Sequence, residues 1–309
     1  MTTKPQLTGL LLPSREAVLW ADSDFGLLVD AAKDAEAAGY DSVWVGDSLL
    51  ARPRGEPMSL LAAIAGATKK VTLGTAVLLP LLRNPLTMAH QAATVDRVSH
   101  GRLVLGVGSG ADLPGTHAEL AALNVPSHRR VTDMLASIDR WRRLWRNEES
   151  GLELLPRPVR PEGPPVWLAG NGPRMLRAAG ESFEGLIPFS PTPEAYASGV
   201  KAVNEAATRA GREPSSVTKG CYVTVAIAAN AKDAAKDLDD YMRGYYGVPA
   251  EVMSKAQACH AGTIESAAAW FASYRAAGAE HLVIRIARPS LDGYTEAARQ
   301  VLRAATARG

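Results

Sequence analysis

The chain has 309 residues, of which 47% are hydrophobic and 21% are charged, which is typical of a globular protein with a large core and excludes a disordered chain. The 34 Lys and Arg residues nearly balance the 32 Asp and Glu residues, and the charges are dispersed, so we expect neither a nucleic-acid nor a membrane partner. Only two cysteines are present, Cys221 and Cys259, and no secretory signal or apolar membrane-spanning run is visible, which predicts a cytoplasmic protein without a disulfide framework.

Short apolar runs alternate with amphipathic stretches along the whole chain. The runs predict strands at 7–12, 42–45, 71–78, 103–107, 166–169, 186–189, 222–228 and 281–286. Helical spacing predicts helices at 24–38, 57–67, 84–98, 231–246, 264–277 and 294–305, with further helices opening at Pro173 and at Thr192-Pro193. Proline in the first turn and glycine after the last turn, as at Pro85 and Gly39, mark the helix ends.

Two stretches are longer than a simple strand-to-helix connection. The segment 108–165 holds one strong helix, at about 128–145, and a proline-rich crossing. A second helical piece, at 249–259, lies between the helix at 231–246 and the helix at 264–277. Eight nearly continuous apolar strands alternating with helices predict an α/β fold, a single (β/α)₈ TIM barrel over 1–309 with insertions after strands 4 and 7. A doubly wound open sheet is the alternative.

In such a barrel, chemistry lies on the loops that follow the carboxyl ends of the strands. Asp47 and Ser48 follow the second strand, and Asp47 either hydrogen-bonds within a pocket or serves as a helix cap or as a salt-bridge partner of Arg52 or Arg54. The six histidines lack metal-ligand spacing, so no metal is expected. His117 and His128 flank a loop and are proton-transfer candidates.

Glycines follow the fourth strand in the pattern Gly106-Val107-Gly108-Ser109-Gly110-Ala111. The pattern matches a dinucleotide-binding fingerprint, but no helix begins directly after it and no acidic strand end follows about twenty residues later. We therefore interpret these glycines as positions of close approach to a flat ligand. The same segment has glycine where the nucleophile elbow of a hydrolase needs serine, which argues against a serine triad.

A helix start follows the fifth strand at Asn171-Gly172-Pro173-Arg174-Met175. Asn171 is an N-cap candidate, and unpaired backbone N–H groups at a helix start attract anions. The segment therefore predicts a phosphate site, to which Arg285 or Arg288 adds charge from the eighth strand; a plain helix cap is the alternative.

Several of these segments together resemble the bacterial luciferase-like family of flavin-dependent oxidoreductases. The similar segments are 40–47, 71–77, 93–110, 165–170 and 278–285. The resemblance implies a barrel, often dimeric, that holds reduced FMN or the deazaflavin coenzyme F420 at the carboxyl ends of its strands. It also implies a non-proline cis peptide at Ala76–Val77 that forms a bulge under the cofactor ring, with Ser109 and Gly110 close by.

The sequence departs from two branches of that family. In the deazaflavin-dependent sugar-phosphate dehydrogenases the second strand ends in Asp-His and the fourth loop carries Glu, whereas here the matching residues are Asp47-Ser48 and Ala111. In the monooxygenases, a separate reductase supplies reduced FMN, and a dry pocket shields its reaction with O₂. Four leucines suit such a pocket: Leu78, Leu79, Leu81 and Leu82. The catalytic candidates are accordingly Asp47, Ser48 and His117.

Three functional hypotheses follow. The first is a monooxygenase that uses reduced FMN and O₂ on a small organic substrate. The second is a hydride-transferring reductase or dehydrogenase that uses coenzyme F420, and the third is a flavin-binding barrel without catalysis. The expected partners are a small-molecule substrate, a separate flavin or deazaflavin reductase, and a second copy of the chain.

Overall fold

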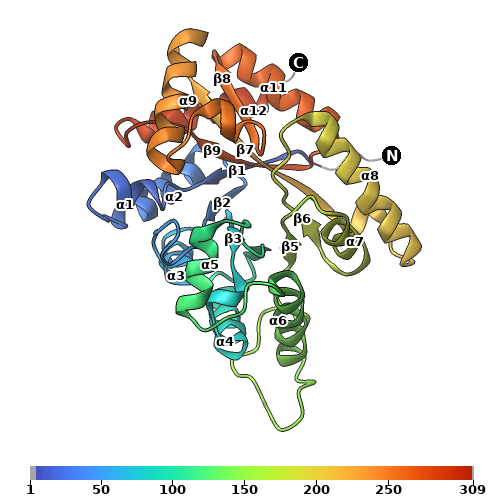
Figure 1. Cartoon of the computed structure of the whole chain (residues 1–309). Helices are drawn as coiled ribbons and strands as arrows, with labels where there is room; N and C mark the ends of the chain where they lie inside the picture. The colour runs from blue at the N-terminus through green and yellow to red at the C-terminus, as the bar shows by residue number, and fades with distance from the viewer. Residues whose placement is uncertain (1–4, 308–309) are drawn as a thin grey trace.

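Eight parallel strands close into a barrel in the computed structural model, which describes residues 5–307 (Figure 1). In ring order they are β1 (Leu7–Leu11), β2 (Ser42–Val45), β3 (Thr72–Leu78), β4 (Leu103–Val107), β5 (Val166–Leu168), β6 (Gly185–Leu186), β7 (Thr218–Ile227) and β9 (His281–Ile286). The pairs β6–β7 and β1–β9 complete the ring. The predicted TIM barrel is therefore confirmed, and the open sheet is excluded because these two pairs close the ring.

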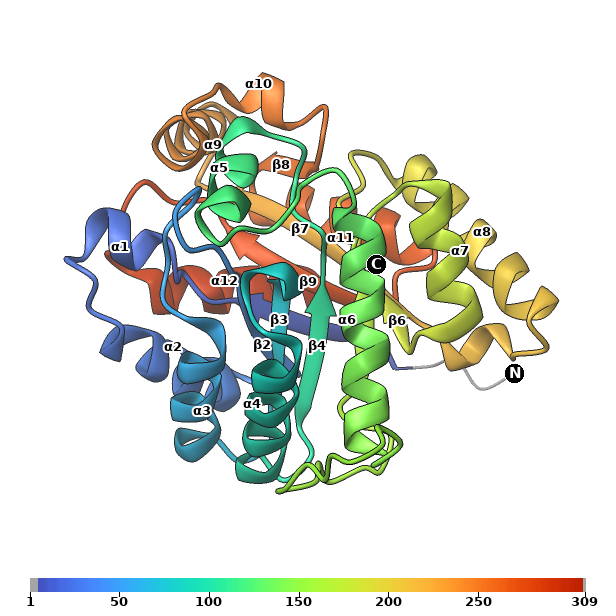
Figure 2. The ribbon, with the colours of Figure 1, turned by 60° about the horizontal axis from the view of Figure 1, so that its bottom comes forward.

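Helices surround the barrel and connect its strands. They are α1 (Glu16–Trp20), α2 (Gly26–Ala38), α3 (Pro57–Ala67), α4 (Pro85–Val98), α5 (Pro114–Ala122), α6 (Arg130–Trp145), α7 (Pro173–Ser182), α8 (Pro193–Arg209), α9 (Ala231–Tyr246), α10 (Ala250–Met253), α11 (Ile264–Ala276) and α12 (Tyr294–Thr306). Two short 3₁₀ turns, η1 (Pro80–Leu82) and η2 (Pro214–Ser216), complete the set. Figure 2 shows α5 at the end of the molecule toward which the β4 arrow points, whereas the chain between α6 and β5 runs at the opposite end.

Large aromatic side chains fill the inside of the barrel. The ring centroids of Trp44 and Trp167 are 5.3 Å apart, and Ser42 and His281 lie beside Trp44. Neighbouring glycines make room for them, because a Cβ at Gly74 would lie 2.1 Å from Trp44 Cε3. The interior is thus a packed core, which leaves only the ends of the barrel for a ligand.

The structure differs from the prediction in both insertions. The segment 113–115, expected to continue a loop, contains the start of α5. The helical piece expected at 249–259 is short, since α10 ends at Met253 and β8 (Ala258–Gly262) follows. β8 is a ninth strand outside the ring, and it pairs with the end of β7, which extends past its neighbours and offers an unpaired edge. Between residues 5 and 307, no helix is both long enough and apolar enough to cross a membrane.

Candidate active site

A cavity of about 350 Å³ opens at the carboxyl ends of the strands, where a barrel places its chemistry. Its walls come from the ends of β3 and β9, from the loops after β1, β2, β3, β4 and β6, from α5 and α9, and from the middle of β7. Polar and charged side chains from separate loops converge on it, and its volume lies in the usual range for a small-molecule site.

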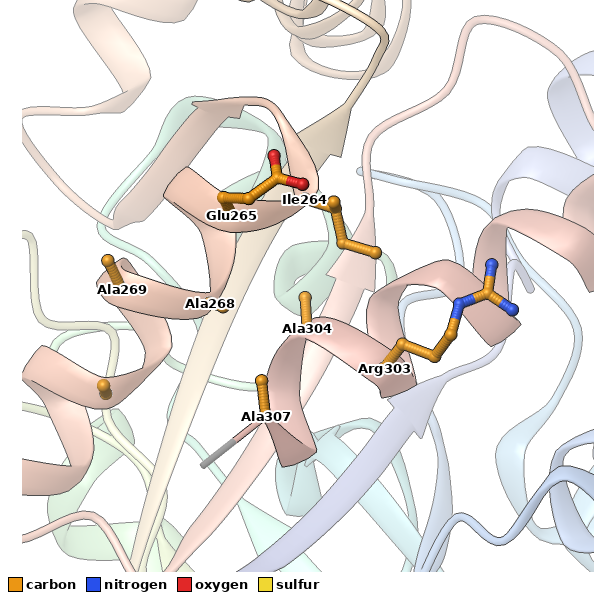
Figure 3. Close-up of a pocket in the computed structure, with 8 residues that line it drawn as sticks. Ile264, Glu265, Ala268, Ala269, Arg303, Ala304 and Ala307 are labelled. Atoms are coloured by element: carbon orange, nitrogen blue, oxygen red, sulfur yellow. The ribbon is translucent and has the colours of Figure 1, made fainter. Parts of the chain in front are cut away.

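A second hollow, of about 430 Å³, lies between α11 and α12 in the outer helical layer (Figure 3). Alanines line most of it, and Glu265 and Arg303 are its charged residues. Both helices lie outside the barrel, and the alanines bring no polar group that could orient a substrate. The cavity at the strand ends is therefore the candidate active site.

One wall of the cavity is built by the end of β3. The peptide bond Ala76–Val77 is cis, which confirms the prediction, and the pairing of β3 with β4 shifts register between Thr75 and Leu78. Ala76 and Val77 both line the cavity. The resulting bulge presents a small, apolar surface on which a flat ring can lie.

Two glycines at the end of β4 lie against the bulged β3. A Cβ at Gly106 would lie 2.1 Å from the Thr75 carbonyl oxygen, and one at Gly108 would lie 2.9 Å from Val77 Cγ2. Gly106 and Gly108 therefore allow a close approach between β4 and the bulged β3. Gly110 does line the cavity, whereas Ser109 does not lie on its wall.

Asp47, at the end of β2, is buried in an ion pair. Its carboxylate accepts hydrogen bonds from Arg83 Nη1 at 2.6 Å, Arg83 Nη2 at 2.9 Å and the Leu79 N–H at 2.9 Å. Burial raises the pKa of Asp47, and the Arg83 guanidinium opposes that rise. Of the alternatives for Asp47, a salt bridge with Arg52 or Arg54 is wrong, because η1 after β3 carries Arg83 onto Asp47 instead.

Ser48 meets Glu119, a residue that the sequence analysis missed. The Ser48 hydroxyl donates to Glu119 Oε1 at 3.0 Å, and the same oxygen accepts from the N–H groups of Leu49 and Leu50. Both side chains are buried and line the cavity. Proline in the first turn of α5, at Pro114, was the available signal for the helix that brings Glu119 there.

Arg285 from β9 lies in a shell of tyrosines. Its guanidinium donates to Tyr246 Oη at 2.6 Å, Thr224 Oγ1 at 3.1 Å and Gln257 Oε1 at 3.1 Å. The ring of Tyr245 lies 4.9 Å from its central carbon. With 2% of its surface exposed, Arg285 borders the cavity but is already held by three neutral acceptors.

The predicted phosphate segment begins α7, away from the lining of the cavity. Gly172, not Asn171, is the N-cap, because the Asn171 side chain donates to the Phe189 carbonyl instead. The N–H groups of Gly172 and Arg174 have no acceptor among the described residues, as an anion site requires. Pro173 occupies the first turn, and Met175 is buried beneath it.

Three other predicted candidates lie outside the cavity wall. His117 is half-exposed, and its Nε2 lies 2.7 Å from Asp112 Oδ1 on the outside of α5. His128 is exposed. Arg288 donates a hydrogen bond to the carbonyl of Asp292.

Four leucines were expected to shield a cofactor. Of these, Leu79 lines the cavity and Leu78 is buried in the core.

The family model described as luciferase-like monooxygenase matches residues 8–288. The chain is 29% identical over 218 residues to the 5,10-methylenetetrahydromethanopterin reductase of Methanolobus tindarius, covering 66% of this chain and 64% of that protein. It is 37% identical over 175 residues to the F420-dependent glucose-6-phosphate dehydrogenase of Amycolatopsis mediterranei, covering 52% of each. The chain thus spans between half and two thirds of these two relatives.

Solved structures share the fold over almost the whole chain. The monooxygenase RslO1 from Streptomyces bottropensis superposes with a TM-score of 0.79 at 21% identity, covering 96% of both chains. An F420-dependent secondary alcohol dehydrogenase, solved with an F420–acetone adduct, gives a TM-score of 0.79 at 20% identity, covering 98% of this chain and 100% of that one. At these identities the likeness supports the barrel alone.

Proposed function

This chain belongs to the luciferase-like monooxygenase family of oxidoreductases, and from that premise we propose that it transfers hydride with coenzyme F420. The observation that carries the proposal is the polarity of the cavity, which is lined by four arginines, Arg15, Arg52, Arg54 and Arg285, and by three tyrosines, Tyr222, Tyr245 and Tyr246. The monooxygenase hypothesis needs a dry, apolar pocket. A cavity lined by guanidinium groups suits a hydride transfer better, and the 37% identity to an F420-dependent dehydrogenase supports the same choice.

The residues at the cavity fit a flat tricyclic cofactor. The Ala76–Val77 bulge is one wall, and the small residues Gly110 and Ala111, which follow the neighbouring strand β4, also line the cavity. The free N–H groups of Gly172 and Arg174 would hold the cofactor's phosphate at the start of α7. When bound, F420 supplies a ring carbon that accepts or releases hydride.

Proton transfer falls to Ser48 and Glu119 in this proposal. A hydride moved to or from a carbon that bears oxygen must be accompanied by a proton at that oxygen. The Ser48 hydroxyl lines the cavity, and Glu119 Oε1 lies 3.0 Å behind it, so the pair can relay a proton between substrate and carboxylate. The Asp47–Arg83 ion pair fixes the end of β2, from which Ser48 extends. It thereby acts as a positioning device.

A cofactor titration tests the proposal directly. We expect F420 to bind with micromolar or tighter affinity and its reduced form to be oxidised in the presence of a carbonyl substrate. Reduced FMN with oxygen-dependent product formation would instead favour the monooxygenase, and binding without turnover would favour the non-catalytic barrel. Ser48→Ala, with the exposed Ser198→Ala on α8 as its control, then separates cofactor binding from proton transfer.

Three further predictions accompany this proposal. A separate reductase supplies the reduced cofactor, the chain forms a homodimer, and the protein is cytoplasmic. Light scattering of the purified protein tests the dimer, and reduction of F420 by a partner dehydrogenase in a coupled assay tests the first.

A further inference from the structure

Three arginines reach one side of the candidate active site from consecutive loops. Arg15 lies at the N-cap of α1, directly after β1, and Arg52 and Arg54 belong to the loop between β2 and α3. Gly46 makes room for this arrangement, since a Cβ there would lie 1.9 Å from Arg54 Nη1. The local backbone is therefore shaped around the guanidinium groups.

These arginines form no ion pair within residues 5–307. The two acidic residues on the cavity wall are engaged elsewhere, Asp47 by Arg83 and Glu119 by Ser48 and two backbone N–H groups. Glu16 lies close enough to offset part of the charge of Arg54, but its own hydrogen bond comes from Tyr241. The cavity thus holds more positive than negative charge.

Arg15 has buried hydrogen-bond donors without a partner. Its Nε and Nη1 are inaccessible to solvent and find no acceptor in the described structure, although buried donors are almost always satisfied in proteins. Burial lowers the pKa of Arg15, and the nearby charges of Arg54 and Arg52 lower it further. A charged group held in this way is stabilised when an anion arrives.

Tyrosine rings hold two of the three guanidinium groups from one side. The central carbon of Arg15 lies 4.8 Å from the ring centre of Tyr245, and that of Arg52 lies 4.8 Å from the ring centre of Tyr246. Arg54 donates to the Tyr245 hydroxyl at 3.3 Å. Stacking on a ring restricts the plane of a guanidinium group. In Arg52, which has no buried donor of this kind, it leaves the N–H edge available for a planar or tetrahedral oxyanion, while Arg15 adds its charge from behind.

We propose that Arg15, Arg52 and Arg54 form a subsite for an anionic group of the substrate, so that the enzyme acts on an organic acid or a phosphate ester. The proposal rests on the function proposed above. A cofactor phosphate is the other source of such an anion, but the free N–H groups at the start of α7 follow β5, which lies across the eight-stranded ring from β1. The arginine subsite is therefore assigned to the substrate.

Binding of simple anions without turnover tests the subsite. Inorganic phosphate and malonate are titrated by calorimetry into the full chain, alone and with saturating F420. We compare the wild type with Arg52→Gln and with the Arg15→Gln/Arg52→Gln double variant; Arg209→Gln, an exposed arginine on α8, is the control. Arg52→Gln alone keeps the test valid if the double variant folds poorly.

We expect the affinity of at least one anion to fall about tenfold in Arg52→Gln and further in the double variant, because each lost guanidinium removes charge-assisted hydrogen bonds. The F420 affinity of both subsite variants and the anion affinity of the Arg209→Gln control should stay within about twofold of wild type. In this proposal neither F420 nor Arg209 contacts the subsite. Unchanged anion affinity in both variants would overturn the subsite. A parallel fall in F420 affinity would assign the arginines to the cofactor and overturn the substrate assignment. Anion binding that depends on the arginines in a protein that does not bind F420 would uphold the subsite and reject the proposed function.

Discussion

Arg83 holds both carboxylate oxygens of Asp47, at 2.6 and 2.9 Å, although the two residues lie on different strand-end loops. The side chain of Asp47 is 1% exposed and that of Arg83 is 11% exposed, so water screens this pair little. Glu56 also accepts from Arg83, at 2.9 Å, and completes a three-residue network beneath the cavity.

Because Asp47 balances a buried guanidinium, we predict that Asp47→Asn lowers the free energy of unfolding by about 2–4 kcal/mol, since it leaves Arg83 with only the partly exposed Glu56 as its counter-charge. Urea denaturation measures this change, and Asp30→Asn, in an exposed pair with Lys33, is the control expected to have no measurable effect. Wild-type stability combined with lost activity in Asp47→Asn would contradict the structural role and indicate that Asp47 contacts a ligand.

Glu119 gives a second prediction. Glu119→Gln keeps an oxygen that can accept from Ser48 and the two N–H groups but removes the basic carboxylate, so we expect turnover of F420 to fall about 100-fold with little change in melting temperature. Glu119→Ala removes the acceptor as well and should lower stability by about 1–3 kcal/mol. The exposed Glu205→Gln on α8 is the control. Full turnover in Glu119→Gln would exclude the proposed proton relay.

The start of α7 gives a third prediction. Gly172 has φ −69°, which proline also adopts, and a Cβ there would meet nothing within 4 Å, so Gly172→Pro removes one N–H donor at a compatible φ. We expect this variant to weaken F420 binding about tenfold, and Arg174→Ala to weaken it by a smaller factor. Arg177→Ala, one turn along the same helix, is the control for each fluorescence titration. If both variants bind F420 as tightly as wild type, the phosphate lies elsewhere.

His281 gives a prediction about pH. It is buried inside the barrel, its Nε2 lies 2.7 Å from Ser42 Oγ, and burial lowers its pKa to about 3. Because the imidazole has its ordinary pKa of about 6.5 in the unfolded chain, only the unfolded state gains a proton between pH 6.5 and 3. This residue therefore lowers stability as the pH falls below about 6.5, by about 2 kcal/mol at pH 5, and has no such effect above neutral pH.

Unfolding of His281→Gln at several pH values tests that sign. Its stability relative to wild type should improve as the pH falls from 7.5 to 5, because the variant has no imidazole to titrate. The exposed His90→Gln on α4 is the matched control. A variant that loses stability toward pH 5 as steeply as wild type does would contradict the assignment.

The sequence by itself determined the barrel. The strands of the ring are short, mostly buried apolar runs, and prolines such as Pro57 and Pro85 start the helices where the structure has them. These signals are local, because a strand is recognised from its own apolar residues and a helix end from residues within one or two turns of it. The cis peptide at Ala76–Val77 was likewise predicted, through a resemblance that spans neighbouring residues.

Only the tertiary structure decided which side chains meet at the strand ends. Asp47 and Arg83 are 36 residues apart, and Ser48 and Glu119 are 71 apart, while Arg52 and Arg54 lie closer to Asp47 in sequence but are not its partners. The closing of the ring decides which of these residues meet in space, and nothing in the local sequence distinguishes one arginine from another as the partner of Asp47. Local chemistry therefore fixes the elements of this protein, whereas long-range packing selects the residues of its site.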